Sequence, residues 1–206
     1  MLDNVADVFR CFGTALLNMP GTAAAGYRAS GMPSMMRRDP VGVVAAVAPW
    51  NYPLPMAAWK LAPAIAAGNA VVIKPSENTP LSLLALMATI GDLLPDGVVN
   101  VVCGNGPDVG QHLISHPLVR MISLTVDART GRAVLKAAAG EPLQRAHLAL
   151  RGTAPDIVLP DAALAKRVET LPEARCYNAE SDRHATRRYM LDRARPACHP
   201  PRRAGL

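Results

Sequence analysis

Short apolar runs alternate with segments of helical pattern through most of this 206-residue chain. This alternation constrains the fold strongly, because a continuous apolar strand has to be buried on both faces. The runs that predict strands are residues 41–47, 70–73, 98–102, 121–124 and 147–150, with a short extended piece at 156–159. The segments that predict helices are residues 3–19, 54–67, 80–94, 106–115 and 130–139. We therefore expect an α/β fold, a parallel sheet with helices on both faces.

Capping residues mark the ends of two predicted helices. Gly68 and Asn69 follow the helix over 54–67 and are typical of a C-cap. Thr79 precedes Pro80, which predicts Thr79 as the N-cap of the next helix and Pro80 as its first residue.

Half of the residues are apolar and 18% are charged, so the chain can build a packed core. No apolar run is long enough to span a membrane, and Asp3 stands where a secretory signal has basic residues. The cysteines lack metal-ligand spacing; they are Cys11, Cys103, Cys176 and Cys198. We interpret them as reduced thiols of a cytoplasmic protein and expect no metal site.

The net charge of +6 is concentrated at the C-terminal end. Residues 183–206 contain seven arginines and one aspartate, which account for all of it. Two interpretations stay open, an arm for nucleic acid or an acidic partner and a solvated, unstructured end. Because only Tyr189 interleaves with the arginines, base stacking has little support and nucleic-acid binding is disfavoured.

Lys74 and Glu77 follow the strand over 70–73, where the ligand crevice of a parallel sheet lies. An ammonium and a carboxylate three residues apart can clamp the two hydroxyls of a ribose, one donating and one accepting. The carboxylate would also repel a 2′-phosphate, which favours NAD over NADP. The alternative is a surface salt bridge of little consequence.

Asn51 comes just after the strand over 41–47, at the same predicted edge of the sheet. Its side-chain amide can donate a hydrogen bond to a developing oxyanion. The alternative is an asparagine that satisfies the backbone of a turn. Gly104, Gly106 and Gly110 form a further glycine-rich turn, but the last gap is one residue longer than in the usual phosphate-binding fingerprint.

Three runs of this sequence resemble the cofactor side of the aldehyde dehydrogenase superfamily. They are VAPWNYP at 47–53, WKLAPAIAAGN at 59–69 and VVIKPSE at 71–77. The resemblance extends roughly over residues 7–182 and implies a Rossmann-like domain that binds NAD for the oxidation of an aldehyde. The runs RRDPVGV at 37–43 and MAAWK at 56–60 are particularly similar to the bacterial aminobutyraldehyde and betaine-aldehyde branch, which suggests an amino-aldehyde substrate.

The resemblance also implies roles for individual residues. Asn51 takes the oxyanion position, and Trp50 lines the cofactor cleft, with core packing as its alternative. The implied cofactor-binding residues are Val47, Ala48, Pro49, Trp50, Lys74, Pro75, Ser76, Glu77, Gly106, Gly110 and Thr125.

The turn at 125–127 departs from the family pattern. The family's Thr-Gly-Ser aligns with Thr125, Val126 and Asp127. Val126 in place of glycine hinders close backbone approach. Asp127 in place of serine suits the start of the helix over 130–139, but it repels the pyrophosphate expected there.

The family's nucleophile and base are also missing. Family members use a cysteine thiolate to attack the aldehyde and a glutamate to activate water. The glutamate position is Ala149 in the run 149–153, and the cysteine position is Arg183 in the run 178–183. Cys176 lies upstream of that position, and we interpret it as a small buried apolar residue.

We expect an aldehyde dehydrogenase family protein that is truncated at both ends and catalytically inactive, a pseudoenzyme. An abrupt change after Asp182 suits a frame-shifted end. The alternative is a non-catalytic nucleotide-binding or subunit-interaction module that pairs with a full-length relative. The expected organisation is a helical segment 1–37, a NAD-binding-like α/β domain 38–160, a remnant 161–182 that leads into the catalytic domain, and a basic, unstructured tail 183–206.

Overall fold

The computed structural model describes residues 2–19, 22–23, 35–140, 143–150, 154–159 and 186–191, with separate residues between 162 and 178. The chain divides into two compact units, Met1–Leu150 and Arg151–Leu206. The first unit holds the sheet and helices that the sequence predicts, and the second holds a small two-stranded sheet.

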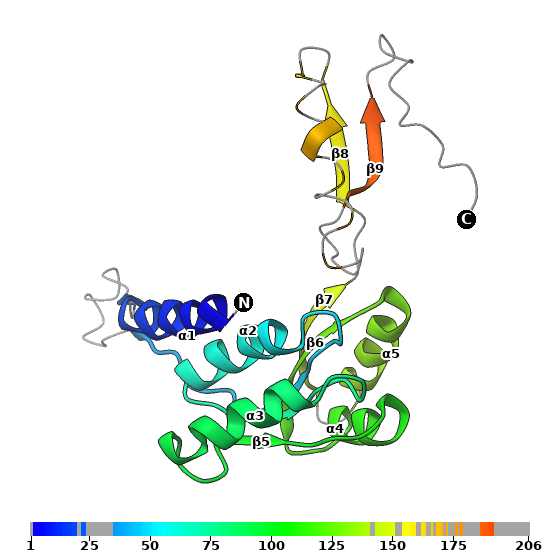
Figure 1. Ribbon diagram of the computed structural model, residues 1–206. Coiled ribbons are helices and arrows are strands. Elements are labelled where there is room, and N and C mark those ends of the chain that lie inside the picture. Colours follow the sequence, from blue (N-terminus) through cyan, green and yellow to red (C-terminus); the bar gives the residue numbers. More distant parts are fainter. Residues whose placement is uncertain are drawn as a thin grey trace, which may run out of the picture. The chain divides into compact units, whose positions relative to one another are not determined.

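A five-stranded parallel sheet forms the centre of the first unit (Figure 1). Its order is β5-β4-β3-β6-β7, so the chain runs outward from β3 to one edge and then crosses back to build the other half. The strands are β3 Val43–Val47, β4 Ala70–Lys74, β5 Val99–Val101, β6 Val119–Val126 and β7 Arg145–Leu150. The predicted parallel α/β sheet is thereby confirmed.

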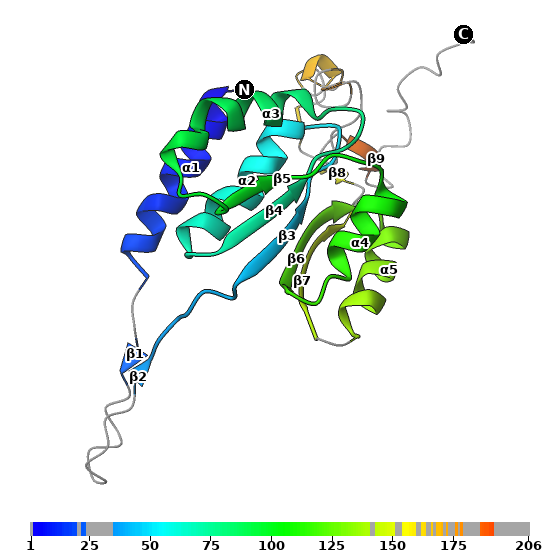
Figure 2. The same ribbon diagram turned by 90° about the horizontal axis from the view of Figure 1, so that it is seen from below.

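Helices cover both faces of this sheet, with α1, α2 and α3 on one side and α4 and α5 on the other (Figure 2). Their bounds are α1 Leu2–Leu17, α2 Pro53–Ala66, α3 Leu81–Ile90, η2 Gly91–Leu93, η3 Gly106–Gly110, α4 Gln111–Ile114 and α5 Ala128–Ala138. The central strand explains why two layers form. Val44 and Ala46 pack under α2 and α3, whereas Ala45 packs under α4 and α5. Side chains alternate along a strand, so an uninterrupted apolar run needs a cover on each face.

The helix α2 lies between the sheet and α1. Ala57 packs into the core under the sheet-facing side, while its neighbour Ala58 packs against Val5 and Val8 of α1. Both alanines are fully buried, which fits a helix covered on two sides. Phe12 of α1 also meets Trp59 edge to face, with ring centroids 6.1 Å apart.

One predicted helix cap is wrong. The N-cap of α3 is Pro80, and Thr79 makes no capping hydrogen bond. Instead the Thr79 N–H donates to the Ser76 carbonyl at 3.1 Å, which ties Thr79 into the preceding turn. A residue before proline is also pushed away from helical geometry. Gly68, by contrast, adopts φ +77° directly after the last turn of α2, as its predicted C-cap role requires.

The second unit corrects the prediction of an unstructured tail for residues 186–191. Residues Thr186–Leu191 form β9, which pairs in parallel with β8, Ala154–Val158. Tyr189, Met190 and Leu191 favour a strand, and the preceding Arg187 and Arg188 hid this pattern. Arg183, which the sequence predicts at the position of the family's nucleophile, lies outside the described residues.

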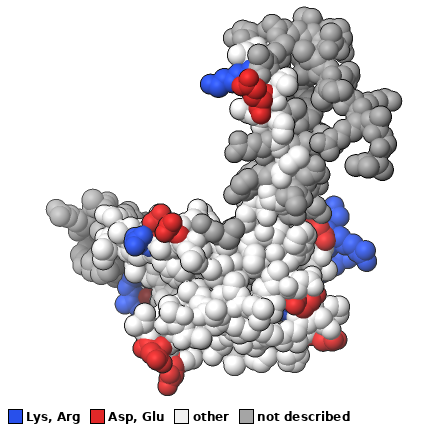
Figure 3. Space-filling model, in the orientation of Figure 1, with Lys and Arg blue, Asp and Glu red and all other residues white. Residues whose placement is uncertain are grey.

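A short antiparallel pair, β1 Thr22–Ala23 and β2 Met35–Met36, links α1 to the sheet. Charged side chains lie in small separate groups on the face shown in Figure 3, and they form no continuous basic patch among the residues coloured there. Within the described part of the chain, no helix is long and apolar enough to cross a membrane.

Asn69 joins the end of α2 to the entrance of β3. Its Oδ1 accepts hydrogen bonds from the N–H groups of Val41 and Gly42 at 2.7 and 3.1 Å, and its Nδ2 donates to the Ala64 carbonyl at 3.0 Å. The side chain is buried, so water cannot easily replace these bonds.

Substitution of Asn69 tests this link. Asn69→Ala leaves the N–H groups of Val41 and Gly42 without their acceptor and should lower the free energy of unfolding by about 2–3 kcal/mol. Urea-induced unfolding measures the change. Asn100→Ala is the matched control, because Asn100 is exposed and makes one bond, to the Gly97 carbonyl. Equal effects of the two substitutions would contradict the assigned role.

Candidate functional site

The register of the sheet brings the predicted site residues to one edge. Val47 at the end of β3 pairs with Lys74 of β4 on one side and with Leu124 of β6 on the other. Neighbouring strands are about 4.8 Å apart, so the ends of β4 and β6 lie about 10 Å from each other. Ligands of open parallel sheets bind at this carboxyl edge.

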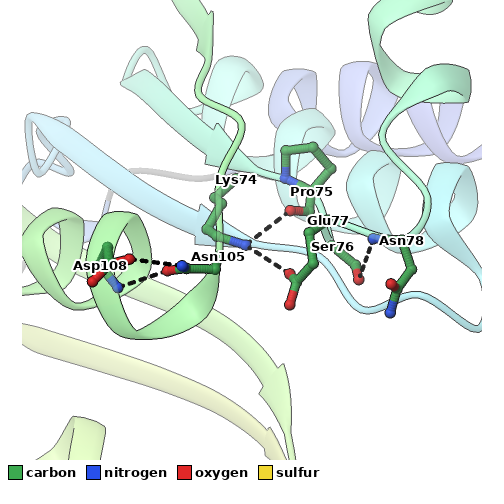
Figure 4. A network of polar contacts seen from close by, with 7 residues as sticks. All are labelled: Lys74, Pro75, Ser76, Glu77, Asn78, Asn105 and Asp108. Carbon is green, nitrogen blue, oxygen red and sulfur yellow. Dashed lines mark hydrogen bonds and ion pairs between the residues drawn. The ribbon is translucent and has the colours of Figure 1, made fainter.

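Lys74 is a buried cation at this edge. It is 2% exposed, and its Nζ donates to the Pro75 carbonyl at 3.1 Å and to Oε2 of Glu77 at 3.3 Å (Figure 4). An ammonium has three donors, so these two bonds leave one N–H for a further acceptor. The Glu77 side chain is 54% exposed. Because Lys74 is buried, the Lys74–Glu77 pair differs from a salt bridge between two surface side chains, which is the alternative interpretation from the sequence.

Glu77 is held in its charged form. A hydrogen bond from its own backbone N–H lowers the pKa of the Glu77 carboxyl, partial desolvation opposes this, and Lys74 lowers the pKa further. The carboxylate is therefore an ionised acceptor at neutral pH. Ser76 helps to shape the same turn, since its Oγ accepts a hydrogen bond from the Asn78 N–H at 3.3 Å (Figure 4).

The glycine-rich turn after β5 lies against Lys74, and one of its N–H groups is taken by a side chain of the turn itself. A Cβ added to Gly110 would lie 3.7 Å from Cδ of Lys74, an ordinary contact, while Gly106 is exposed with free space around it. Oδ1 of Asn105 accepts from the Asp108 N–H at 2.8 Å, and Nδ2 of Asn105 donates to Asp108 Oδ2 at 2.7 Å (Figure 4). The start of η3 is thus capped by the chain itself.

The turn after β3 carries the predicted cofactor-facing and oxyanion residues. The Ala48 N–H donates to the Lys74 carbonyl at 3.0 Å, which continues the pairing of β3 with β4. Pro49 and Asn51 are half-buried, and Trp50 is 56% exposed. Core packing, the alternative for Trp50, is therefore wrong, and the indole stands open at the ligand edge.

Lys60 is a site residue that the sequence reasoning missed. It is 6% exposed and donates from Nζ to Oγ1 of Thr125 at 2.9 Å, across 65 positions of sequence. A single lysine in the otherwise apolar α2 was the available signal. Thr125 pairs in register with Ala149 of β7, so Ala149, which the sequence predicts at the position of the family's base, lies next to this lysine–threonine pair.

Asp127 begins α5. Its Oδ1 accepts from the Thr130 N–H at 2.8 Å, which confirms that this aspartate suits the helix start. That hydrogen bond lowers the pKa of the Asp127 carboxyl, with smaller contributions from the Arg129 N–H and the Thr130 hydroxyl against desolvation. Gly131 lies in α5 where this helix packs closely against β7. A Cβ added at Gly131 would lie 2.5 Å from Cδ2 of Leu150, so this position leaves no room for a larger side chain.

One cysteine prediction is wrong. Cys176 is exposed, not buried. Among the described residues, no three or more histidine, cysteine, aspartate or glutamate side chains form a group that could hold a metal ion.

Comparisons with known proteins assign the family. The model of the aldehyde dehydrogenase family matches residues 1–195. A curated relative, 3,6-anhydro-alpha-L-galactose dehydrogenase of Streptomyces coelicolor, is 44% identical over 176 residues, 84% of this chain and 33% of the relative. The chain belongs to the aldehyde dehydrogenase family, a family of NAD-dependent aldehyde oxidation, and it spans a third of this relative's length.

Solved structures agree with the sequence comparison. The NAD⁺ complex of an aldehyde dehydrogenase from Bacillus cereus superposes with a TM-score of 0.88 at 30% identity, over 94% of this chain and 39% of that one. The gamma-glutamyl-gamma-aminobutyraldehyde dehydrogenase of Burkholderia cenocepacia J2315 superposes with a TM-score of 0.86 at 37% identity, with the same coverage. The sheet is therefore the Rossmann-like sheet of this family.

The cap at Asp127 should make stability depend on pH. A carboxyl whose pKa is lowered by folding stabilises the protein above its unfolded pKa of about 4, and the contribution disappears as the pH falls through the lowered folded value. Asp127→Asn keeps the cap and should remove this part of the pH dependence. Asp127→Ala should lower the thermal midpoint at pH 7 by roughly 2–4 °C. Thermal scans between pH 7 and pH 3 measure the unfolding midpoint of the parent and of both variants. If the midpoint of Asp127→Asn varied with pH as that of the parent does, the role of Asp127 in the pH dependence would be contradicted.

Proposed function

We propose that this chain is a NAD-binding part of an aldehyde dehydrogenase family protein and does not itself carry out covalent aldehyde oxidation. The observation that carries the proposal is the contrast along one edge of the sheet. A buried Lys74 with an ionised Glu77 stands at the end of β4, and Ala149 stands in β7 where the family has its base.

The ribose would be held by the pair at the end of β4. The third N–H of Lys74 would donate to one hydroxyl, and the exposed Glu77 carboxylate would accept from the other. The related Bacillus cereus enzyme was solved with NAD⁺, which supports the choice of cofactor. Glu77 would repel a 2′-phosphate and so favour NAD over NADP.

The remaining predicted contacts would surround the same ligand. Pro49 and Trp50 would line the cleft beside the turn after β3. The further cofactor-binding residues that we propose are Val47, Ala48, Pro75, Ser76, Gly106, Gly110 and Thr125. A Cβ added at Gly106 would meet nothing within 4 Å, so the turn has open space at this position.

Covalent turnover needs groups that this chain does not supply. Asn51 could still polarise a carbonyl, but no thiolate would attack it at Arg183 and no carboxylate would activate water at Ala149. The nucleophile and the base act in one pathway, so losing both leaves no thioester route. NAD would bind when present and supply the hydride acceptor of the family reaction.

A second role is pairing with a full-length relative. Trp50 and Leu150 are large apolar side chains that are 56% and 42% exposed near the ligand edge. In this second role the partner would cover these side chains. We propose a cytoplasmic location, as the reduced cysteines suggest, and an amino-aldehyde as the substrate class of any active partner, in line with the Burkholderia relative's name.

Thermal unfolding with NAD tests the cofactor assignment. NAD at ten times its dissociation constant should raise the midpoint by about 3–5 °C. Lys74→Ala and Glu77→Gln should reduce this rise, each against its own scan without ligand. Lys136→Ala is the matched control, because Lys136 is exposed on α5. No rise in the parent chain would contradict the proposal.

The choice between NAD and NADP is a separate prediction. Glu77→Gln removes the charge that repels the 2′-phosphate, so it should narrow the ratio of NADP to NAD dissociation constants by about tenfold. Titration calorimetry with both cofactors measures this ratio. An unchanged ratio would show that Glu77 does not face the 2′ position.

The predicted lack of turnover is tested by NADH formation from a panel of aldehydes, including an aminobutyraldehyde. NADH formation with the chain should not exceed that of a blank without protein. Ala149→Glu alone should not restore NADH formation, because it adds no nucleophile. An intact family member in the same assay is the positive control. NADH formed by the parent chain and lost in Asn51→Ala would overturn the proposal.

A further inference from the structure

The order of the strands locates the point where phosphate would bind. β4 and β5 lie on one side of β3, and β6 and β7 on the other, so the chain changes direction between β3 and β6. Crevices at such a point take nucleotides, and their phosphates bind to the N–H groups of helix N-termini. The two helices that begin here are α2, after β3, and α5, after β6.

The N-terminus of α2 offers few donors. Pro53 and Pro55 lack an N–H, and the Met56 N–H donates to the Tyr52 carbonyl at 2.9 Å. Leu54 is the one residue among the first three of α2 that has a backbone donor. A phosphate would gain little from this end of the helix.

The N-terminus of α5 is closed by a negative charge. Oδ1 of Asp127 already accepts the Thr130 N–H, and Oδ2 lies 3.4 Å from the Thr130 hydroxyl. A carboxylate therefore occupies the place that a phosphate oxygen would take, and it is exposed to whatever enters there. A second anion at this point would be repelled by it.

The neighbouring helix start points the same way. Asp108 adds a carboxylate to the first turn of η3, and the Asp108 N–H already donates to the Asn105 side chain. The cations at this edge, Lys60 and Lys74, are buried and donate to oxygen acceptors of the chain itself. Glu77, Asp108 and Asp127 are exposed carboxylates at this edge, and Arg129, in the first turn of α5, is an exposed cation close to Asp127.

We propose that Asp127 makes this crevice select against ligands with a phosphate at the β6–α5 turn, so that the chain binds ribonucleosides more tightly than their diphosphates or NAD. This inference rests on the proposed function, because Lys74 and Glu77 hold the ribose in the proposed NAD site and in the proposed nucleoside site alike. The inference goes beyond the proposed function because it assigns to Asp127 the choice between ligands with and without a phosphate.

Charge-removing substitutions that keep the helix cap test this role. Asparagine and serine cap helices as well as aspartate does, so Asp127→Asn and Asp127→Ser should leave α5 intact. The control is Asp92→Asn, which removes the same charge from η2 at the far end of α3. Calorimetric titrations with adenosine, ADP and NAD at low salt give the dissociation constants of the full chain and its variants.

In the parent chain, adenosine should bind about threefold or more tightly than ADP. Both Asp127 variants should bind ADP and NAD about fivefold to tenfold more tightly than the parent does, with adenosine unchanged. Added salt should reduce the difference in the parent and not in the variants. Asp92→Asn should match the parent.

The two proposals fail in different ways. The role of Asp127 is overturned, and the NAD site stands, if ADP and NAD bind to the parent more tightly than adenosine and neither Asp127 substitution changes their dissociation constants. In that case adenosine should still bind to the parent and not to the Glu77→Gln variant. If neither the parent nor the Asp127 variants bind any of the three ligands, the proposed NAD site fails, and this inference fails with it.

Discussion

The register of β3 with its two neighbours is the constraint on which the site depends. Val47 faces both Lys74 and Leu124, and the Ala48 N–H extends the pairing by one more bond to the Lys74 carbonyl. A slip of one residue would turn Lys74 to the opposite face of the sheet. The same slip would take the fully buried Val71 and Ile73 out of their core, which makes this register costly to change.

Much of the fold could be predicted because its strands are buried on both faces. An uninterrupted apolar run such as 43–47 has few other uses in a small α/β unit, and Lys74 and Glu77 share a turn, so their contact is local. The contact between Lys60 and Thr125 could not be predicted in this way, because it depends on how α2 lies over β6. Local competition explains the other errors: Ser76 holds Thr79 away from the helix cap, and arginines hide the strand β9.

The carboxyl edge combines groups that can orient a sugar with few that could assist chemistry. Lys74 and Glu77 remain as a pair, while the register partner of Thr125 is an alanine and the start of α5 carries a carboxylate. On the proposed function, this family site has lost its reactive groups and kept its sheet, which can happen because the core alternation and the catalytic side chains depend on different residues. This separation between packing and chemistry is the central claim for this chain.

A crystal structure of the chain grown with NAD tests that claim most directly. The account predicts the adenosine ribose at the end of β4, with one hydroxyl within hydrogen-bonding distance of Lys74 Nζ and the other facing the Glu77 carboxylate, and no protein side chain within reach to attack a carbonyl beside Asn51. A ligand bound away from β4, or a thiolate or carboxylate brought next to Asn51, would contradict it.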